Sequence, residues 1–432
     1  MASAFGVALS ALSATSSAID VVGNNLANLN TTGYKATQVL FSDMMAQSLG
    51  GATNPAQLGL GVGQISTVTN YTQGTITNTQ IGTDVAIQGN GFFILKDSNN
   101  QTLYTRDGSF QVDANGNLIT ADGSYVQGYP AVAGVVNTNS AISTLKIPVG
   151  SVVPATPTNN MTLTLNLDAA TAIAGANPTT ASYSAPIQVI DSLGGQHTLT
   201  VAFTKTANNA WNFEIDIPNA DLAAAGTAGI TAKSTQLTTG TLTFNADGSL
   251  DLTKTTSPVK FSITGLADGA NDMTGADGKG MNWSLTDSTG AATLTQYSEA
   301  SSVGGTWQDG IQTGQIATVN IQNGGLLVAQ YSNGQSVDVG QLALAGISNP
   351  QTMISVGDNN LQATATTAPP AIGLANTSGR GKIIGEALES STADMATEFT
   401  HLLTYERSYQ AASRVITTSD QLLQETVNLI HP

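Results

Sequence analysis

The C-terminal end of the chain carries a large apolar side chain at every seventh position. The repeat consists of Met395, Leu402, Tyr409, Ile416, Leu423 and Ile430. A seven-residue period places these side chains on one stripe of an α-helix, as in a coiled coil. We therefore predict a helix from about 393 to 430, with Ser391 and Asp394 forming a capping box at its start.

The N-terminal end shows the same periodicity. Phe5, Leu12, Ile19 and Leu26 recur at intervals of seven, which predicts a second helix that ends near Leu29. We call the apolar residues of the two repeats the assembly seam. The rest of the N-terminal helix is small and weakly polar, and its small-residue face suits close approach by further helices; that face is built around Ala4, Ala8, Ala11, Ala14 and Ala18.

These two helices have two interpretations. They could form an ordinary pair within one monomer. However, both ends of the chain are apolar and the body between them is polar, a pattern that favours contact between the ends of different copies. We therefore predict that the assembly seam contacts other copies of the chain.

The sequence between the two helices predicts β structure. Residues 161–167, 197–203 and 211–217 alternate apolar and polar side chains, the period of a strand with one buried face. Short turn signals separate such runs, at Asp107-Gly108, Asn115-Gly116, Asp247-Gly248, Asn323-Gly324-Gly325 and Asn333-Gly334. The predicted fold class is mainly β with helical termini: nested antiparallel β domains, barrel-like or sandwich-like, on a terminal helix pair.

Composition limits the number of domains and the kinds of partner. At roughly 100 to 200 residues per domain, 432 residues make two to four domains. The net charge is −16, with 13 Lys and Arg against 29 Asp and Glu, which argues against nucleic acid and anionic lipid as partners. No run of 18 consecutive apolar residues predicts a membrane span, and the start lacks the basic region of a cleaved signal peptide. The chain has no Cys, which excludes disulfides and thiolate sites.

No recognisable catalytic or cofactor motif is present. The histidines His197, His401 and His431 have no metal-ligand spacing, and there is no G-x-S-x-G motif. Gly381-Lys382 is followed by Ile383 where a P-loop needs Ser or Thr. A calcium loop at Asp113, Asn115 and Asn117 is disfavoured, because these residues lie in an evident hairpin. We expect no enzyme activity, no cofactor and no metal site.

The two ends of the chain resemble a known family. Residues 9–35 resemble the N-terminal signature of the bacterial flagellar rod and hook axial proteins, and residues 385–430 resemble the C-terminal signature of the same family. The N-terminal motif consists of Asp20, Gly23, Asn24, Asn25, Asn28, Asn30, Gly33 and Tyr34, followed by Lys35. Residues 88–95 and 104–119 are similar to a segment shared across the family. The middle of the chain resembles the hook members, at 187–205, 307–310 and 331–350.

This resemblance implies a structural function. Hook subunits leave the cell through the flagellar type III export apparatus, without a cleaved signal peptide. They then polymerise outside the cell into a short, curved, hollow tube that acts as a universal joint between rod and filament. The implied partners are other copies of the chain, the distal rod protein, and the hook cap and hook–filament junction proteins. Neither nucleic acid binding nor membrane insertion is expected.

The resemblance also implies a nested domain order. Residues 1–30 with 388–432 would form a helical core domain, and 31–70 with 366–387 the connecting segments. Residues 71–145 with 290–365 would form an inner β domain, and 146–289 an inserted outer β domain. Two alternatives stay open, a distal rod subunit of the same family and a secreted β-rich adhesin.

Overall fold

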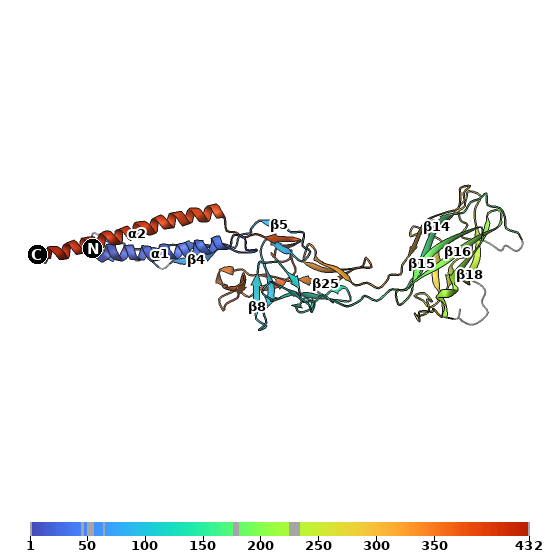
Figure 1. Cartoon of the computed structure of the whole chain (residues 1–432), viewed down its shortest axis with the longest axis horizontal. Helices are drawn as coiled ribbons and strands as arrows, with labels where there is room; N and C mark the ends of the chain where they lie inside the picture. The colour runs from blue at the N-terminus through green and yellow to red at the C-terminus, as the bar shows by residue number, and fades with distance from the viewer. Residues whose placement is uncertain are drawn as a thin grey trace. The chain divides into compact units, whose positions relative to one another are not determined.

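The computed structural model describes residues 2–44, 47–49, 56–63, 65–175, 181–223 and 234–430. The chain divides into two compact units (Figure 1). The first unit contains Met1–Val149, Ala317–Gln330 and Ser336–Pro432, and the second contains Gly150–Ile316 and Tyr331–Gln335. The mainly β fold with helical ends confirms the predicted fold class.

Both terminal helices are present in the first unit, where they lie side by side (Figure 1). Helix α1 spans Ala2–Ala27 and helix α2 spans Met395–Ile430, close to the predicted limits. The predicted capping box is wrong in one respect. Asp394 itself caps α2, because its Oδ1 accepts the backbone N–H of Thr397 at 2.8 Å, whereas Ser391 Oγ accepts the N–H of Ala393 ahead of the helix.

Helix α1 is long and apolar enough to cross a membrane by length and composition alone. Its mean hydropathy over Phe5–Ala27 is 1.5. No long apolar run marks this property in the sequence, because Ser and Thr interrupt every run, while the many Ala residues still raise the mean hydropathy. Core helices of soluble proteins and signal sequences near an N-terminus share this composition, and 28% of this stretch is buried within the chain.

The first unit contains most of the short strands. They are β1 (Thr37–Leu40), β2 (Gln47–Leu49), β3 (Ala56–Leu58), β4 (Ser66–Thr69), β5 (Ile76–Asn78), β6 (Val85–Gln88), β7 (Phe92–Lys96), β8 (Thr102–Thr105), β9 (Gln111–Val112), β10 (Leu118–Ile119), β11 (Tyr125–Val132), β12 (Val135–Val136), β13 (Ser143–Thr144), β23 (Ile316–Ile321), β24 (Leu326–Tyr331), β25 (Ser336–Leu342), β26 (Leu344–Gly346), β27 (Ile354–Gly357), β28 (Asn360–Gln362), β29 (Ala371–Gly373), β30 (Lys382–Gly385) and β31 (Ala387–Glu389). The main sheet follows the order β23-β24-β25-β11-β7-β8-β28-β27. Its ladders β24–β25, β25–β11, β11–β7, β7–β8, β8–β28 and β28–β27 are antiparallel, as predicted.

The segment expected to be a simple connector, 31–70, is partly structured. Its described residues form two antiparallel pairs, β1 with β4 and β2 with β3. The segment also contacts both helices. Ser10 Oγ accepts the backbone N–H of Val62 at 3.2 Å, and the Phe41 ring lies 5.8 Å from the Tyr405 ring. We call residues 37–69 the arm.

The second unit consists of two sheets around one core. Its strands are β14 (Asn160–Asn166), β15 (Tyr183–Ile190), β16 (Gln196–Ala207), β17 (Ala210–Pro218), β18 (Ser234–Thr243), β19 (Val259–Phe261), β20 (Met281–Ser284), β21 (Leu294–Thr295) and β22 (Ser302–Gln308). One sheet has the order β15-β16-β17-β18, and the other has β19-β20-β14-β21 with β22 beside β14. All three predicted strands, in β14, β16 and β17, are confirmed.

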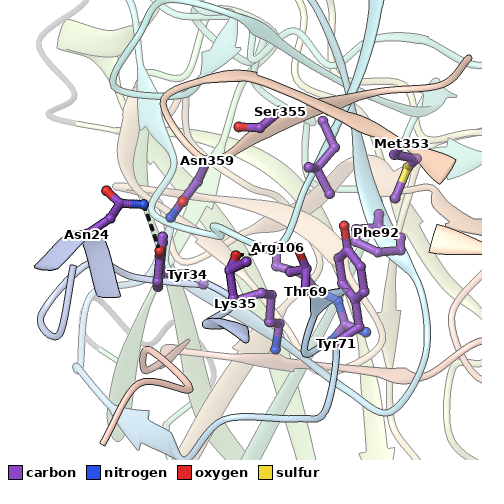
Figure 2. A pocket seen from close by; sticks show the side chains of 13 residues that line it. Asn24, Tyr34, Lys35, Thr69, Tyr71, Phe92, Arg106, Met353, Ser355 and Asn359 are labelled. Atoms are coloured by element: carbon purple, nitrogen blue, oxygen red, sulfur yellow. Dashed lines mark hydrogen bonds between the residues drawn. The ribbon is translucent and has the colours of Figure 1, made fainter. Parts of the chain in front are cut away.

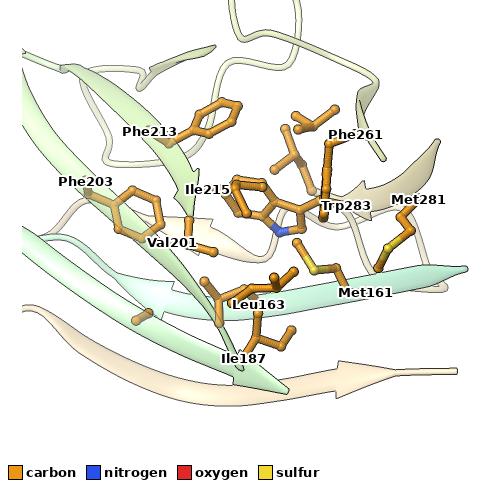
Figure 3. Packing of buried hydrophobic residues seen from close by; sticks show 14 of the residues in the cluster. Met161, Leu163, Ile187, Val201, Phe203, Phe213, Ile215, Phe261, Met281 and Trp283 are labelled. Carbon is orange, nitrogen blue, oxygen red and sulfur yellow. The ribbon is translucent and has the colours of Figure 1, made fainter. Parts of the chain in front are cut away.

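Alternating side chains of these strands build the core (Figure 3). Trp283 from one sheet and Phe213 from the other are both buried and meet edge to face, with ring centroids 5.1 Å apart. The buried indole of Trp211 donates its N–H to Gln296 Oε1 at 3.1 Å, so its polar atom is satisfied.

Two features of the second unit differ from the prediction. Strand β14 pairs in parallel with β20 and β21, because the whole β15–β18 sheet lies between them in sequence and supplies the long connection that parallel pairing needs. Strand β22 also pairs along β14. Residues 290–316 therefore belong with the second unit, whereas the sequence analysis assigned them to the inner domain.

Candidate assembly surface

The buried face of α1 is its small-residue face. Ala8, Ala14 and Ala18 are buried, and Val22 and Asn25 continue this face toward the end of the helix. Small side chains allow two helix backbones to approach closely, and α2 lies against this helix. We expected this face to suit close approach by further helices, and Ala8, Ala14 and Ala18 are already buried within the single chain. The side chain of Ala4 lies outside the described residues.

The assembly seam lies beside this contact and is incompletely covered. On α1, Phe5 is 38% exposed, and Leu12, Ile19 and Leu26 are half-buried. On α2, Met395 is 57% exposed, and Tyr409 and Leu423 are also exposed. Leu402 and Ile416 are half-buried, and the side chain of Ile430 lies outside the described residues. The seam therefore borders the helix pair and is not its interior.

Further large apolar side chains extend this surface. They are Leu9 on α1 and Phe399, Leu403, Val415 and Leu422 on α2, all exposed in the isolated chain. Together with the seam, these side chains give both helices apolar surface that stays exposed although the two helices pack against each other. Large apolar side chains exposed in such numbers on two neighbouring helices are typical of a protein–protein interface.

The family motif lies at the base of α1, where Asn25 joins three segments. The Asn25 side chain is buried, and its Nδ2 donates to Thr37 O at 2.8 Å and to Glu398 Oε1 at 3.0 Å. Its Oδ1 accepts the backbone N–H of Thr37 and the hydroxyl of Tyr34, each at 3.0 Å. All four hydrogen-bonding positions of this amide are occupied. Asn25 thus ties α1 to the arm and to the first turn of α2.

Burial changes the titration of the groups around Asn25. It raises the pKa of Glu398, against the lowering effect of the Asn25 hydrogen bond. Burial also raises the pKa of the Tyr34 hydroxyl, and the Glu398 carboxylate adds to that rise. Both groups therefore keep their protons more readily than they would in water.

The remaining motif residues lie in the last turns of α1 and in the turn that follows it. Asn24 Nδ2 donates to the Tyr34 hydroxyl at 3.2 Å, and Asn28 Oδ1 accepts the Thr31 hydroxyl at 3.0 Å. Gly33 has φ +69°, and a Cβ there would lie 2.7 Å from the Arg106 carbonyl carbon, so only glycine fits. The other three, Asp20, Gly23 and Asn30, are exposed.

A buried ion network lies below this turn. Glu389 Oε1 lies 2.7 Å from Lys35 Nζ, and its Oε2 lies 3.4 Å from Arg106 Nη1. Lys35 Nζ also donates to Thr72 O at 2.7 Å, and Arg106 Nη2 donates to Gly89 O at 2.9 Å. Burial lowers the pKa of Lys35 and of Arg106, while Glu389 raises both. One carboxylate thus holds two cations where the helices join the β strands of the first unit.

Figure 2 shows a cavity of about 190 Å³ beside this network. Asn24, Tyr34, Lys35, Tyr71 and Asn359 are among the residues that line it. The described lining residues include no His, Cys or free carboxylate that could act as a base or nucleophile, and Glu389 already engages its Lys and Arg. The arrangement is suited to rigid support of the helix base.

Sequence reasoning found the motif but missed its partners. Glu398, Glu389 and Arg106 lie within the segments 385–430 and 104–119 that resemble the family. Their contacts were not predictable, because they depend on the pairing of segments far apart in sequence, such as β31 with β5. The suspected calcium loop is explained by its own hairpin. Asp113 Oδ1 accepts the backbone N–H groups of Asn115 and Asn117 at 2.8 and 2.7 Å.

Four sequence families match successive parts of the chain. Residues 5–35 match the Flagella basal body rod protein family, and residues 86–165 match the Flagellar hook protein FlgE/F/G D1 domain. Residues 158–311 match the Flagellar basal body protein FlaE D2 domain. Residues 384–429 match the Flagellar basal body rod FlgEFG protein C-terminal family.

Relatives extend the match over nearly the whole chain. Proteins named flagellar hook protein FlgE from Treponema pallidum, Borreliella burgdorferi and Escherichia coli are 33%, 35% and 32% identical to it. The alignments cover 95%, 95% and 99% of this chain and 96%, 96% and 100% of the relatives. The chain therefore belongs to the flagellar hook protein FlgE family.

Proposed function

We propose that this chain is a structural subunit of the flagellar hook and that its copies polymerise through the assembly seam. The observation that carries this proposal is the exposed apolar surface of the two terminal helices. In particular, Met395, Tyr409 and Leu423 are exposed on α2 although they recur at the spacing of a coiled-coil stripe. Packing against helices of neighbouring copies would remove this surface from water, at about 25 cal/mol per Å² of apolar area.

The proposed assembly is a hollow, curved tube with a layered wall. In this proposal residues 1–30 with 388–432 form the helical core, and residues 31–70 with 366–387 connect it to the β layers. The inner β domain comprises 71–145 with the parts of 290–365 that lie in the first unit, 317–330 and 336–365. The outer domain comprises 146–289 together with 290–316, which pair with it.

We place the chain outside the cell, at the flagellar hook. We propose that the flagellar apparatus exports it without cleavage of a signal peptide and that it does not insert into a membrane. Its neighbours would be the distal rod protein, the hook cap and the hook–filament junction proteins. We propose a structural and not a catalytic role. The names of the relatives do not favour the alternatives, a distal rod subunit or a secreted adhesin.

Electron microscopy of the purified, concentrated protein tests the proposal. We expect tubes whose amount rises with protein concentration, since assembly follows mass action. A chain that stays monomeric at every concentration and salt condition would contradict it.

Limited proteolysis of the monomer is expected to remove the ends first. The helix pair buries few side chains, and all of 421–426 is exposed, so these segments open at low free-energy cost. We expect loss of about 30 residues from each end before any cut within the β strands, because those strands carry the buried cores. Mass spectrometry of the fragments measures this order, and uniform resistance of the intact monomer would contradict it.

Removing the second unit is expected to leave a foldable chain that still forms tubes. Val153 and Gly314 are bridge partners, with Val153 N donating to Gly314 O at 2.9 Å. An Asn-Gly dipeptide in place of residues 154–313 should therefore close a two-residue hairpin between them. Circular dichroism measures folding, and microscopy measures tube yield and curvature. A folded variant that forms no tubes would show that the second unit is an essential interface.

A further inference from the structure

The second unit contains a buried histidine surrounded by three aspartates. His197, near the start of β16, is 6% exposed. Its Nε2 lies 2.9 Å from Asp191 Oδ2 and 3.8 Å from Asp268 Oδ2. On the other side of the ring, Nδ1 lies 3.3 Å from Asp221 Oδ2.

Two of these carboxylates are held in place by their own loops. Asp191 Oδ1 accepts the backbone N–H groups of Leu193 and Gly195, both at 2.8 Å. Asp268 Oδ1 accepts the N–H of Ala270 at 3.0 Å. In each case the second oxygen, Oδ2, is the one that faces His197. Gly195 leaves room for this arrangement, because a Cβ there would lie 2.5 Å from Asp191 Oδ2 and 3.0 Å from Asp268 Oδ2.

The cluster lacks positive charge. None of the ion pairs among the described residues joins a Lys or Arg to Asp191, Asp221 or Asp268. Even a protonated His197 would leave three carboxylates facing one positive charge. Moreover, in the described part of the chain, the buried Nδ1 has no hydrogen-bond partner of adequate geometry despite its closeness to Asp221. Like charges this close are costly unless a cation or a proton lies between them.

We propose that this cluster is a binding site for a divalent transition metal, with Asp191 Oδ2, His197 Nε2 and Asp268 Oδ2 as its ligands. The three atoms lie within 4.8 Å of one another. Zinc bonds of about 2.0 to 2.2 Å require ligand atoms roughly 3.3 to 3.6 Å apart, so small side-chain movements suffice. One imidazole nitrogen with two carboxylates suits zinc better than calcium or magnesium, which prefer oxygen ligands alone.

Asp221 and the solvent complete the site. A metal-bound histidine usually donates its other ring N–H to a carboxylate. Asp221 Oδ2 lies 3.3 Å from Nδ1, so a small side-chain movement would let it accept the Nδ1 proton. The Asp268 side chain is 37% exposed, which leaves a fourth position for water. The bound metal would fasten the 191–195 turn to the 265–270 loop, where Ser192 Oγ already accepts the N–H of Asn271 at 2.9 Å.

Zinc titration of the full-length protein after chelator treatment tests the proposal. We expect one zinc ion per chain by calorimetry and by elemental analysis after dialysis, without competition from magnesium or calcium. Asp268→Asn should weaken zinc binding at least tenfold, while its Oδ1 still accepts the Ala270 N–H. Exposed Glu299→Gln removes a carboxylate from the same unit, and His401→Gln removes a histidine from α2; both should bind zinc as the wild type does.

Two further readouts separate metal binding from simple protonation. Zinc should raise the thermal unfolding midpoint of the wild type but not that of Asp268→Asn. In ¹⁵N NMR spectra it should shift the His197 Nε2 resonance while Nδ1 keeps its proton. Equal zinc affinity in the wild type and in a folded Asp268→Asn would overturn the site.

Discussion

Leu423→Asp is expected to abolish tube formation while leaving the subunit folded. Leu423 is 42% exposed on α2 in the isolated chain, so the subunit itself loses little when the side chain changes. In a tube the same side chain would be buried, contributing about 1.5 to 3 kcal/mol. An unpaired carboxylate in its place adds a desolvation cost of several kcal/mol. Because every subunit repeats the defect, sedimentation should recover no tubes from the variant.

Gln421→Asp is the matched control for this change. It introduces the same residue two positions earlier on the same helix, at an exposed position on the opposite side from the seam. Helix propensity and net charge therefore change similarly in both variants. We expect near-normal tube yield from Gln421→Asp. A normal yield from Leu423→Asp would reject the seam, and a lower unfolding midpoint of its β strands would mean that α2 supports them directly.

Leu12→Asp extends the test to the N-terminal helix. Leu12 is half-buried, so part of its effect falls on the α1–α2 pair itself. We expect loss of tubes together with a loss of helical circular dichroism in the monomer. The comparison with Leu423→Asp separates contacts within the subunit from contacts between subunits.

The helices and strands were predictable from periodicity, but the face that each helix buries was not. Large apolar residues at every seventh position indicate a helix but do not say which of its faces packs within the chain. The structure buries Ala8 and Ala18, because small side chains let α1 and α2 approach closely. The larger seam residues are left at the edge. The sequence of a single chain does not show directly which helix face packs within the chain and which face is left for neighbouring copies.

The clusters of charged residues were beyond sequence reasoning for a related reason. Glu389 meets Lys35 and Arg106 only because β31 pairs with β5 and the chain returns to the base of α1. Asp268 likewise meets His197 only through the fold of the second unit. Neither cluster has a local spacing that a motif search could find. Alternation in β14, β16 and β17 was visible because it depends only on neighbouring residues.

Glu389→Gln is expected to destabilise the first unit by about 3 to 5 kcal/mol, since it leaves two buried cations without their anion. The Glu389 side chain is fully buried, and its Oε1 also accepts the backbone N–H of Gly74 at 2.7 Å. Glutamine keeps the shape and one acceptor, so the loss reports mainly on charge. Glu386→Gln, three residues earlier and exposed, is the matched control and should have little effect. Urea unfolding of each variant measures the free energies.

The pH dependence of the stability lost in Glu389→Gln shows whether the loss comes from the missing charge or from altered packing. Burial lowers the pKa of Lys35 in the folded chain, and Glu389 opposes that effect, so Glu389→Gln should lower the Lys35 pKa further. Between this lowered value and the ordinary lysine value the unfolded chain binds more protons than the folded chain. Stability therefore rises with pH in that window. We expect the deficit of Glu389→Gln to shrink as the pH is raised above neutral, and Lys35→Met in the same background to restore part of the stability at pH 7. A deficit that is the same at every pH, and that Lys35→Met does not reduce, would assign the role of Glu389 to its hydrogen bonds and shape instead of its charge.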